Sequence, residues 1–267
     1  MAEIFAATEM GSNEWTIVKT PRRDKLPRSL DRLREESEKL RELEHEGIVR
    51  WLDQCEQNGT FCLVEALVRG GRMMEMYERL SPTVSDAVLL VKQLAKTTEY
   101  LAKKNPFPFI HGDICPLNVI VRDRGQSCVL IDFGIATRLG HDCPVRAGTR
   151  PWSAPEQMER AEWSLNSDVY ALGATFFFLV TGLPPPDQCN GRDESGSIQA
   201  ALERIDADDE FKDLIVDCLN VDFRHRIRSA SEMLSRLDKI GQPRDHRASP
   251  STSMQARDRR RPLRKGR

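Results

Sequence analysis

The stretch HGDICPLNVIVRDRGQSCVLIDFG, residues 111–134, decides how this chain folds. Two short apolar runs, VIV and VLI, flank a polar turn and predict a β-hairpin. Asn118 precedes the first strand and Asp132 follows the second, so both side chains should meet at one end of the hairpin, with Asp113 nearby. Such oxygen donors suit a hard cation whose other ligands are water and phosphate oxygens. The stretch therefore predicts a magnesium site that accompanies a nucleotide.

Composition sets the broad class of the protein. The 267 residues are 39% hydrophobic, enough to bury a core in one large domain or in a small lobe joined to a larger one. The seven cysteines form no C-x-x-C pair, which favours reduced thiols over disulfides or a zinc site. The longest apolar run, residues 171–183, is too short to span a bilayer, and no signal peptide is visible. We expect a soluble, cytoplasmic protein without a membrane span.

The first 70 residues read as a small β-rich unit with one helix. Leucines recur at helical spacing among charges after residue 29, which predicts an amphipathic helix. Alternating or β-branched runs predict strands on either side of it. The expected elements are a hairpin at 4–7 and 15–19, a helix at 29–44, and strands at 48–52 and 60–64, closed by Gly70 and Gly71.

The remainder reads as mainly helical around the hairpin. The expected elements are helices at 84–104, 168–181, 209–219 and 229–240, with loops at 135–153 and 184–196. Residues 241–267 are rich in Arg, Ser and Pro and almost lack apolar side chains, so this basic tail is expected to be disordered. A solvated end is the favoured interpretation of the tail, and contact with nucleic acid or an anionic surface is the alternative.

Three motifs in a fixed order give the chain a family resemblance. It resembles the protein kinases in an HGD-type catalytic loop, a DFG triplet and an APE triplet. The matching residues are His111, Asp113, Pro116 and Asn118, then Asp132, Phe133 and Gly134, then Ala154, Pro155 and Glu156.

The resemblance implies an α+β, two-lobed protein kinase-like fold over residues 1–240. The β-rich N-lobe would cover about residues 1–70 and the larger helical C-lobe about 71–240. The run DVYALGATFFFLVTGLPP is similar to bacterial Ser/Thr kinases that resemble eukaryotic ones. Counting back from Lys19, the last glycine of the family's glycine-rich loop would fall at Ala2 and the first two before Met1. Either the chain starts late, through truncation or a misplaced start codon, or it lacks the first strand and that loop.

The resemblance also assigns the phosphate contacts. Lys19, at the end of TIVK, corresponds to the lysine that holds the α- and β-phosphates of ATP. Its partner would be a glutamate of the following helix, where the family spacing selects Glu36, with Glu35 as the runner-up. Glu36 also places Leu40 one turn further on, where the family packs an apolar residue into its regulatory spine.

The catalytic roles follow in the same way. Asp113 would accept or orient the proton of the substrate hydroxyl, and Asn118 and Asp132 would hold Mg²⁺. Thr149 matches the threonine that lines the acceptor site in Ser/Thr kinases. The remaining cofactor-binding positions are Ala66 and Val68 in the hinge and Ile120, and the structural positions are His111, Phe133, Gly134, Glu156, Asp168 and Arg226.

Four positions depart from the family pattern. Cys115 replaces a lysine that contacts the γ-phosphate, and Gly112 replaces the arginine that pairs with a phosphorylated activation loop. Ile17 replaces a small alanine beside the adenine, and Glu65 lies near the gatekeeper position. We expect weaker turnover, no control by phosphorylation of that loop, and a narrower purine slot.

The predicted function is therefore that of a Ser/Thr protein kinase, which uses ATP and Mg²⁺ to phosphorylate a hydroxyl of a protein substrate. The alternative is a pseudokinase, a binding or scaffold module with weak or no nucleotide binding, which the missing glycine-rich loop, Cys115 and Ile17 suggest. A small-molecule phosphotransferase would need an open acceptor pocket in place of the APE segment, so that segment argues against it.

Overall fold

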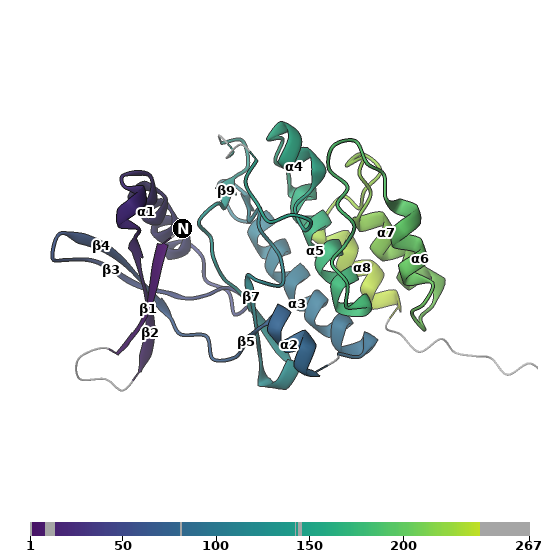
Figure 1. The fold of residues 1–267 in the computed structure, drawn as a ribbon, viewed down its shortest axis with the longest axis horizontal. Helices are drawn as coiled ribbons and strands as arrows, with labels where there is room; N and C mark the ends of the chain where they lie inside the picture. Colours follow the sequence, from purple (N-terminus) through teal and green to yellow (C-terminus); the bar gives the residue numbers. More distant parts are fainter. Residues whose placement is uncertain (1, 9–13, 81, 142, 144–145, 241–267) are drawn as a thin grey trace, which may run out of the picture.

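The chain forms two lobes of unequal size, a small lobe built on a β-sheet and a larger, mainly helical lobe (Figure 1). This computed structural model describes residues 2–8, 14–80, 82–141, 143 and 146–240. The predicted disordered tail, 241–267, lies outside the described residues. The two-lobed α+β fold is confirmed.

A four-stranded antiparallel sheet forms the small lobe. Its strand order is β1-β2-β4-β3, so the predicted hairpin of β1 and β2 lies at one edge. Within this hairpin Ile4 is opposite Lys19, and Lys19 is in turn opposite Leu63 of β4. The strands are β1 (Ala2–Thr8), β2 (Trp15–Pro21), β3 (Trp51–Gln57) and β4 (Thr60–Ala66).

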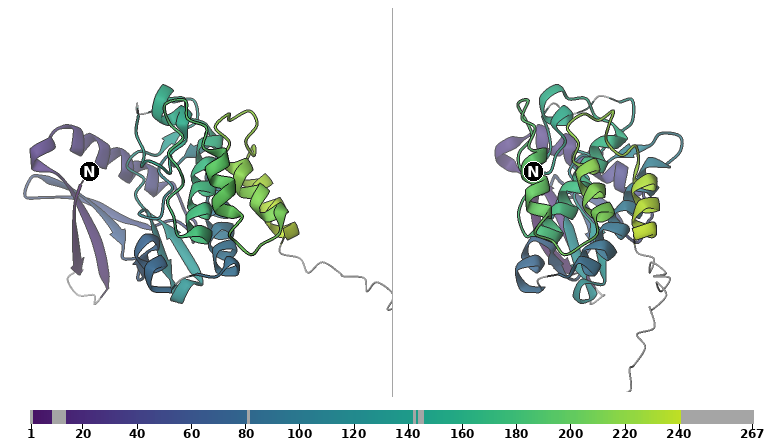
Figure 2. Two further views of the ribbon diagram at one scale, coloured as in Figure 1. Left: turned by 45° about the vertical axis from the view of Figure 1, so that its right-hand side comes forward. Right: turned by 90° about the vertical axis from the view of Figure 1, so that its right-hand side faces the viewer.

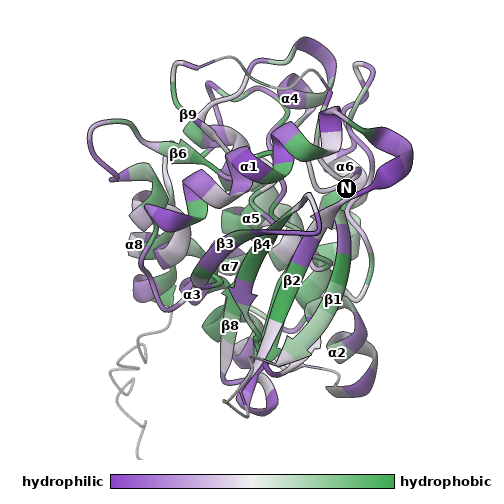
Figure 3. Ribbon diagram, turned by 90° about the vertical axis from the view of Figure 1, so that its left-hand side faces the viewer, coloured by the Kyte–Doolittle hydropathy of each residue, from purple (hydrophilic) through white to green (hydrophobic). Residues whose placement is uncertain are grey.

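Helix α1 (Arg28–Arg41) packs on this sheet, where the leucine spacing predicts a helix. Its inward side buries Leu33, Glu36 and Leu40, while most of its charged residues are exposed. Figure 3 shows the contrast between the mainly hydrophilic α1 and the hydrophobic stretches of the strands beside it. An amphipathic helix of this kind is stabilised chiefly by the burial of its apolar side.

The strand predicted at 48–52 is wrong in position, because the strand β3 begins at Trp51. Val49 instead donates its N–H to the carbonyl of Leu130 in the large lobe (3.0 Å), and Leu130 donates to Gly47 (2.8 Å). The apolar pair Ile48 and Val49 is buried in this contact between the lobes. Strand β3 itself is polar and mostly exposed on both sides. The apolar residues before it therefore led to a predicted strand that begins too early.

The hairpin predicted within residues 111–134 is confirmed, and its second strand contacts the small lobe through Leu130. Strands β7 (Val119–Arg122) and β8 (Ser127–Leu130) pair antiparallel with Val119 opposite Leu130, and β5 (Gly71–Arg72) adds a third strand. A separate two-stranded pair, β6 (Phe109–Ile110) with β9 (Thr137–Arg138), connects the segment before the hairpin to the segment after it.

Two long helices, α3 (Val84–Ala102) and α5 (Leu165–Thr181), form the centre of the large lobe. Residues 167–179 of α5 are all buried, as expected for an almost continuously apolar helix. Figure 2 shows the other helices of this lobe gathered around this pair. They are α2 (Met73–Leu80), α4 (Pro155–Arg160), α6 (Ser195–Leu202), α7 (Asp209–Cys218) and α8 (Ala230–Ile240).

Both long helices begin at capping boxes, which fix where they start. Thr83 accepts the N–H of Asp86 while the Asp86 side chain accepts from Thr83, and Ser164 and Ser167 do the same for α5. The sequence did not predict α2, α4 and α6, because each spans only six to eight residues and gives little periodic signal. Among the described residues, no helix is long and apolar enough to cross a membrane.

Candidate active site

The hairpin brings Asn118 and Asp132 to the same end. The N–H of Ile131 donates to the carbonyl of Asn118 (2.9 Å), so the residue before β7 lies beside the residues after β8. Asp132 has φ +65°, and its Oδ1 accepts the N–H of Gly134 (3.2 Å). This turn out of the strand directs the chain away from β8 immediately after Asp132.

A hydrogen bond fixes the orientation of the Asn118 amide. Its Nδ2 donates to Oδ2 of Asp113 (2.7 Å) and to the Asp113 carbonyl (3.0 Å). The amide oxygen of Asn118 therefore points away from Asp113, which leaves this oxygen directed elsewhere as a potential ligand. Within the described part of the chain, no group of three or more His, Cys, Asp or Glu side chains is arranged to hold a metal. One amide oxygen and the Asp132 carboxylate fit Mg²⁺, which keeps water and phosphate oxygens as its other ligands.

The carboxyl group of Asp113 is held in a largely buried position. Burial raises its pKa, and hydrogen bonds to Thr149 and Asn118 partly oppose that rise. A carboxylate with a raised pKa holds a proton more readily, which suits a group that accepts a proton from a hydroxyl. Thr149 comes from the loop between the DFG and APE triplets, and it lies close enough to Asp113 to affect the pKa of that carboxyl.

Lys19 and Glu36 form a buried ion pair between β2 and α1. Their Nζ and Oε1 atoms lie 2.6 Å apart. Glu35, the runner-up, has a side chain that is 62% exposed and lies 3.8 Å from Lys39. The helix therefore presents Glu36, and not Glu35, to the lysine.

Lys19 has a second carboxylate partner, Glu65, which the sequence analysis did not pair with it. Oε1 of Glu65 lies 2.8 Å from Nζ of Lys19. Burial disfavours the charge on Lys19, but Glu36 and Glu65 outweigh this effect and raise its pKa. Alternate residues of a strand lie on the same face, so Glu65 shares the face of Phe61 and Leu63 in β4. All three side chains are buried, and this spacing could have predicted a buried charge at Glu65.

Asp168 anchors the backbone of the catalytic loop from α5. Its two carboxylate oxygens accept the N–H groups of His111 and Gly112, both at 2.8 Å. Burial raises the pKa of Asp168 to about 6, against the effect of these two hydrogen bonds. The His111 ring packs edge-to-face on Phe133 at 4.7 Å between centroids, and burial lowers the pKa of His111 to about 4. Leu40 and Phe133 are both fully buried in the same core.

Arg226 and Glu156 form an ion pair within the large lobe. The guanidinium donates to both carboxylate oxygens of Glu156, at 2.7 and 3.0 Å, and stacks over the ring of Tyr170. Ser167 adds a hydrogen bond to Glu156 (3.2 Å). This pair ties the start of α4 to the loop before α8, which is a structural task.

Two contacts around Gly112 were not predicted from the sequence. The backbone of Gly112 has φ +75°, and a Cβ added there would lie 2.0 Å from Cζ3 of Trp163. Nε2 of Gln157 donates to the carbonyls of Gly112 (2.6 Å) and Ala147 (2.7 Å), which ties the activation segment to the catalytic loop. Trp163 thus occupies space beside the position where the family has an arginine. No local pattern marked either side chain.

The remaining predicted positions belong to β4, to the segment after it and to the hairpin. Ala66 ends β4 and donates its N–H to Arg50 (2.9 Å), Val68 packs partly buried against the core, and Ile120 is opposite Val129 in the hairpin. Cys115 is fully buried, and burial raises the pKa of its thiol to about 12. A neutral thiol therefore stands where the family has a positive charge.

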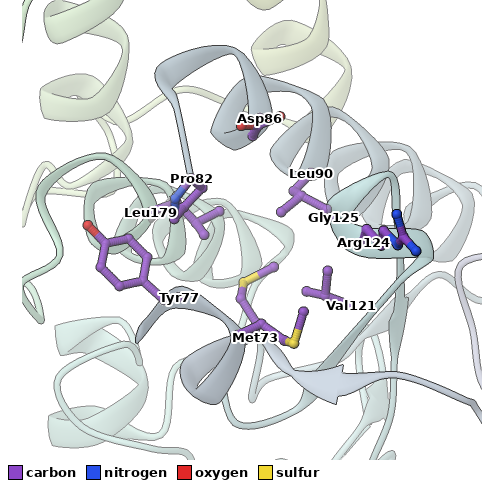
Figure 4. A pocket seen from close by; sticks show the side chains of 10 residues that line it. Met73, Tyr77, Pro82, Asp86, Leu90, Val121, Arg124, Gly125 and Leu179 are labelled. Carbon is purple, nitrogen blue, oxygen red and sulfur yellow. The ribbon is translucent and has the colours of Figure 1, made fainter. Parts of the chain in front are cut away.

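A cavity of about 140 Å³ lies apart from these residues, among α2, α3, α5 and the turn of the hairpin (Figure 4). Its lining is mainly apolar, with Met73, Leu90 and Val121 facing the space and Asp86 and Arg124 beside it. It contains none of the predicted site residues.

Comparisons with known proteins agree with this geometry. The family model of the protein kinase domain matches residues 1–236. A serine/threonine-protein kinase/receptor of Acanthamoeba polyphaga mimivirus is 28% identical over 215 residues, which cover 78% of this chain and 13% of that protein. Smooth-muscle myosin light chain kinase of Gallus gallus is 27% identical over 208 residues, which cover 74% of this chain and 11% of the relative. Serine/threonine-protein kinase pXi of Dictyostelium discoideum is 27% identical over 195 residues, which cover 71% and 28%.

This chain therefore spans less than a third of the length of each of these relatives. The match to the family model extends over both lobes and includes all three motifs. The chain belongs to the protein kinase domain family.

Proposed function

We propose that this protein is a serine/threonine protein kinase that transfers the γ-phosphoryl group of ATP to a hydroxyl of a protein substrate. The observation that supports it most is the hydrogen bond from Asn118 to Asp113, at the end of the hairpin that also carries Asp132. It holds the proposed proton acceptor beside one oxygen donor for Mg²⁺, at the end of the hairpin that also carries the second proposed donor.

Each of these side chains has a separate task. Asp113 accepts or orients the proton of the acceptor hydroxyl, for which its raised pKa is suited. Lys19, steadied by Glu36, binds the α- and β-phosphates, and Asn118 and Asp132 hold the cation. Bound Mg²⁺ supplies positive charge that offsets the charge developing on the phosphates.

Other predicted positions would contact the acceptor residue and the nucleotide base. Thr149, which matches the acceptor-site threonine of the family and helps to lower the pKa of Asp113, favours Ser or Thr as the acceptor. Ala66, Val68 and Ile120 are the proposed contacts for the nucleotide base. All seven cysteines are free thiols, which agrees with a reducing cytoplasm. The similarity of DVYALG to bacterial kinases stays a prediction, since the relatives named above are eukaryotic or viral.

Incubation of the purified full chain with MgATP labelled at the γ-phosphate and a generic acceptor protein tests this function. We expect label on serine or threonine after hydrolysis of the acceptor. The absence of transfer to any acceptor, or label on tyrosine alone, would contradict the proposal. The pseudokinase alternative gains no support from the comparisons, whose named relatives are kinases. It predicts no thermal stabilisation by millimolar MgATP, whereas a bound nucleotide should raise the melting temperature.

A further inference from the structure

The carboxylate of Glu65 is buried at the inner face of the small-lobe sheet. Glu65 is opposite Ile17 of β2 and opposite Trp51 of β3, so the three side chains lie in one row on the same face. Trp51 donates to Ser37 of α1 (2.9 Å), which shows that this face is turned toward the helix. Only 3% of Glu65 is exposed, so its charge depends on what faces it inside the lobe.

The groups that act on Glu65 come from three elements. They are the ammonium of Lys19 on β2, the carboxylate of Glu36 on α1, and the carboxylate of Asp132 after β8. Three carboxylates therefore share one ammonium, which leaves the cluster with an excess of negative charge when all of them are ionised. Such an excess is costly in a buried site.

Glu65 is the less well bonded of the two partners of Lys19. Oε1 of Glu36 accepts a hydrogen bond from Nζ, whereas Oε1 of Glu65 lies at 2.8 Å and has no hydrogen-bond partner with suitable geometry. Burial raises the pKa of Glu65 to about 7, and the attraction of Lys19 only partly opposes this rise. Burial raises the pKa of Glu36 as well, but Glu36 accepts the hydrogen bond from Lys19. Glu65 is thus the carboxylate beside Lys19 that can take up a proton without loss of that hydrogen bond.

We propose that Glu65 is a positioning residue that competes with nucleotide phosphates for Lys19, so that Mg-nucleotide binding is coupled to uptake of one proton by Glu65. This inference rests on the proposed function, in which Lys19 binds the phosphates. Phosphates bring further negative charge to the same ammonium, which raises the cost of an ionised Glu65. The proton comes from solvent and adds to the Glu65 carboxylate, while Lys19 remains an ammonium. Nucleotide affinity therefore falls as the pH rises through neutrality.

Isothermal titration calorimetry of the full chain with MgATP measures this coupling directly. Titrations at pH 7 in two buffers with different ionisation enthalpies give the number of protons taken up. We expect roughly half a proton per nucleotide, because about half of the Glu65 carboxyls already carry a proton at this pH. Between pH 6 and pH 8 the Kd of the wild type should weaken roughly fivefold, as expected if binding moves the pKa by about one unit. Glu65→Gln should remove this part of the uptake and bind MgATP roughly fivefold more tightly than the wild type at pH 8.

Two further variants make the test specific. Glu56→Gln, on exposed β3 of the same sheet, should match the wild type in affinity and proton uptake. Glu65→Met removes the charge with an apolar side chain and should also bind more tightly at pH 8 than the wild type. Protonation of the nucleotide itself appears equally in every variant and cancels in the comparison.

The outcomes separate this inference from the proposed function. If Glu65→Gln binds MgATP no more tightly than the wild type at pH 8, or keeps the same proton uptake, the inference is wrong and the kinase function stands. If neither the wild type nor any variant binds MgATP at any pH, the proposed function fails and the inference fails with it. Should the Glu65 variants not fold, the wild type decides alone, because zero proton uptake at pH 7 overturns the inference.

Discussion

Lys19 Nζ and Glu36 Oε1 lie 2.6 Å apart, and both side chains are buried between the sheet and the single long helix of the small lobe. The pair fixes α1 relative to β2, because the buried Glu36 carboxylate would otherwise lack its cation. Burial raises the pKa of Glu36, and Lys19 opposes that rise. The position of the lysine in the cleft therefore depends on α1.

Glu36→Gln should lower kcat/KM for ATP. Loss of the charged partner weakens the hold on Lys19, and we expect a decrease of roughly 10- to 100-fold, which corresponds to about 1.4 to 3 kcal/mol. Steady-state phosphotransfer at several ATP concentrations measures it. Glu35→Gln is the matched control, since that side chain is 62% exposed, and it should retain full activity. Equal losses in the two variants would contradict the assignment of Glu36.

Arg226→Ala should strongly destabilise the large lobe. It leaves the buried Glu156 carboxylate without its cation, and removal of one partner of a buried ion pair costs about 3–5 kcal/mol. Urea unfolding followed by circular dichroism measures the free energy of unfolding. Arg224→Ala, with a side chain that is 75% exposed, should leave this free energy unchanged within error. A similar small effect in both variants would show that the pair is not structural.

Gly112→Ala should destabilise the protein through contact with Trp163. The new Cβ would lie 2.0 Å from the indole, so the ring has to move, and the positive φ adds strain. Gly191→Ala controls for φ alone, because Gly191 has φ +71° and no atom lies within 4 Å of an added Cβ. We expect a larger drop in melting temperature for Gly112→Ala than for Gly191→Ala.

The double variant Gly112→Ala with Trp163→Ala tests the cause. If the clash with the indole is the reason, the two changes together should cost less than the sum of the single changes. Strict additivity would show that Trp163 does not restrict the residue at this position.

His111 should make stability depend on pH in the acid range. Its pKa is about 4 in the folded state against 6.5 as the ordinary value, so the unfolded chain binds a proton first. Stability from this group is thus complete above pH 6.5 and decreases as the pH falls toward 4, by up to about 3 kcal/mol. Urea unfolding at pH 7, 5.5 and 4.5 measures this dependence.

Asp168 makes stability depend on pH in the opposite direction to His111. A His111 variant is therefore needed to separate the two contributions. Its pKa is raised from 3.8 to about 6, so its contribution to stability decreases as the pH rises from 4 to 6. His111→Asn keeps a hydrogen-bond acceptor for the Asp113 N–H and removes the titration. The difference between the wild type and this variant should decrease on acidification, and a difference that does not vary with pH would contradict the neutral, buried His111.

Local patterns in the sequence were sufficient for the elements that carry the site. Two apolar runs around a polar turn predicted the hairpin of β7 and β8, and helical leucine spacing placed Leu40 on the buried side of α1. Glu36 was selected by the resemblance to the protein kinases, with Glu35 as the runner-up. The strand at 48–52 was misplaced because Ile48 and Val49 bury their apolar surface against the other lobe. That contact joins distant parts of the chain, and no window of local sequence contains it.

Contacts between distant residues account for what the sequence did not predict in the site. Gln157 contacts Gly112, 45 positions earlier in the sequence, and Glu65 on β4 contacts Lys19 on the neighbouring strand β2. Each of these side chains is an ordinary polar residue in its own segment. Their partners become evident only when the strands and the activation segment are placed in space.

The rate of phosphotransfer by Asp113→Asn under single-turnover conditions shows whether Asp113 is the proton acceptor. A properly folded Asp113→Asn variant should lose roughly 10²- to 10⁴-fold in rate while it still binds MgATP. Asp123→Asn, in the exposed turn of the same hairpin, should transfer phosphate at the wild-type rate. Transfer by Asp113→Asn at the full rate would contradict the account.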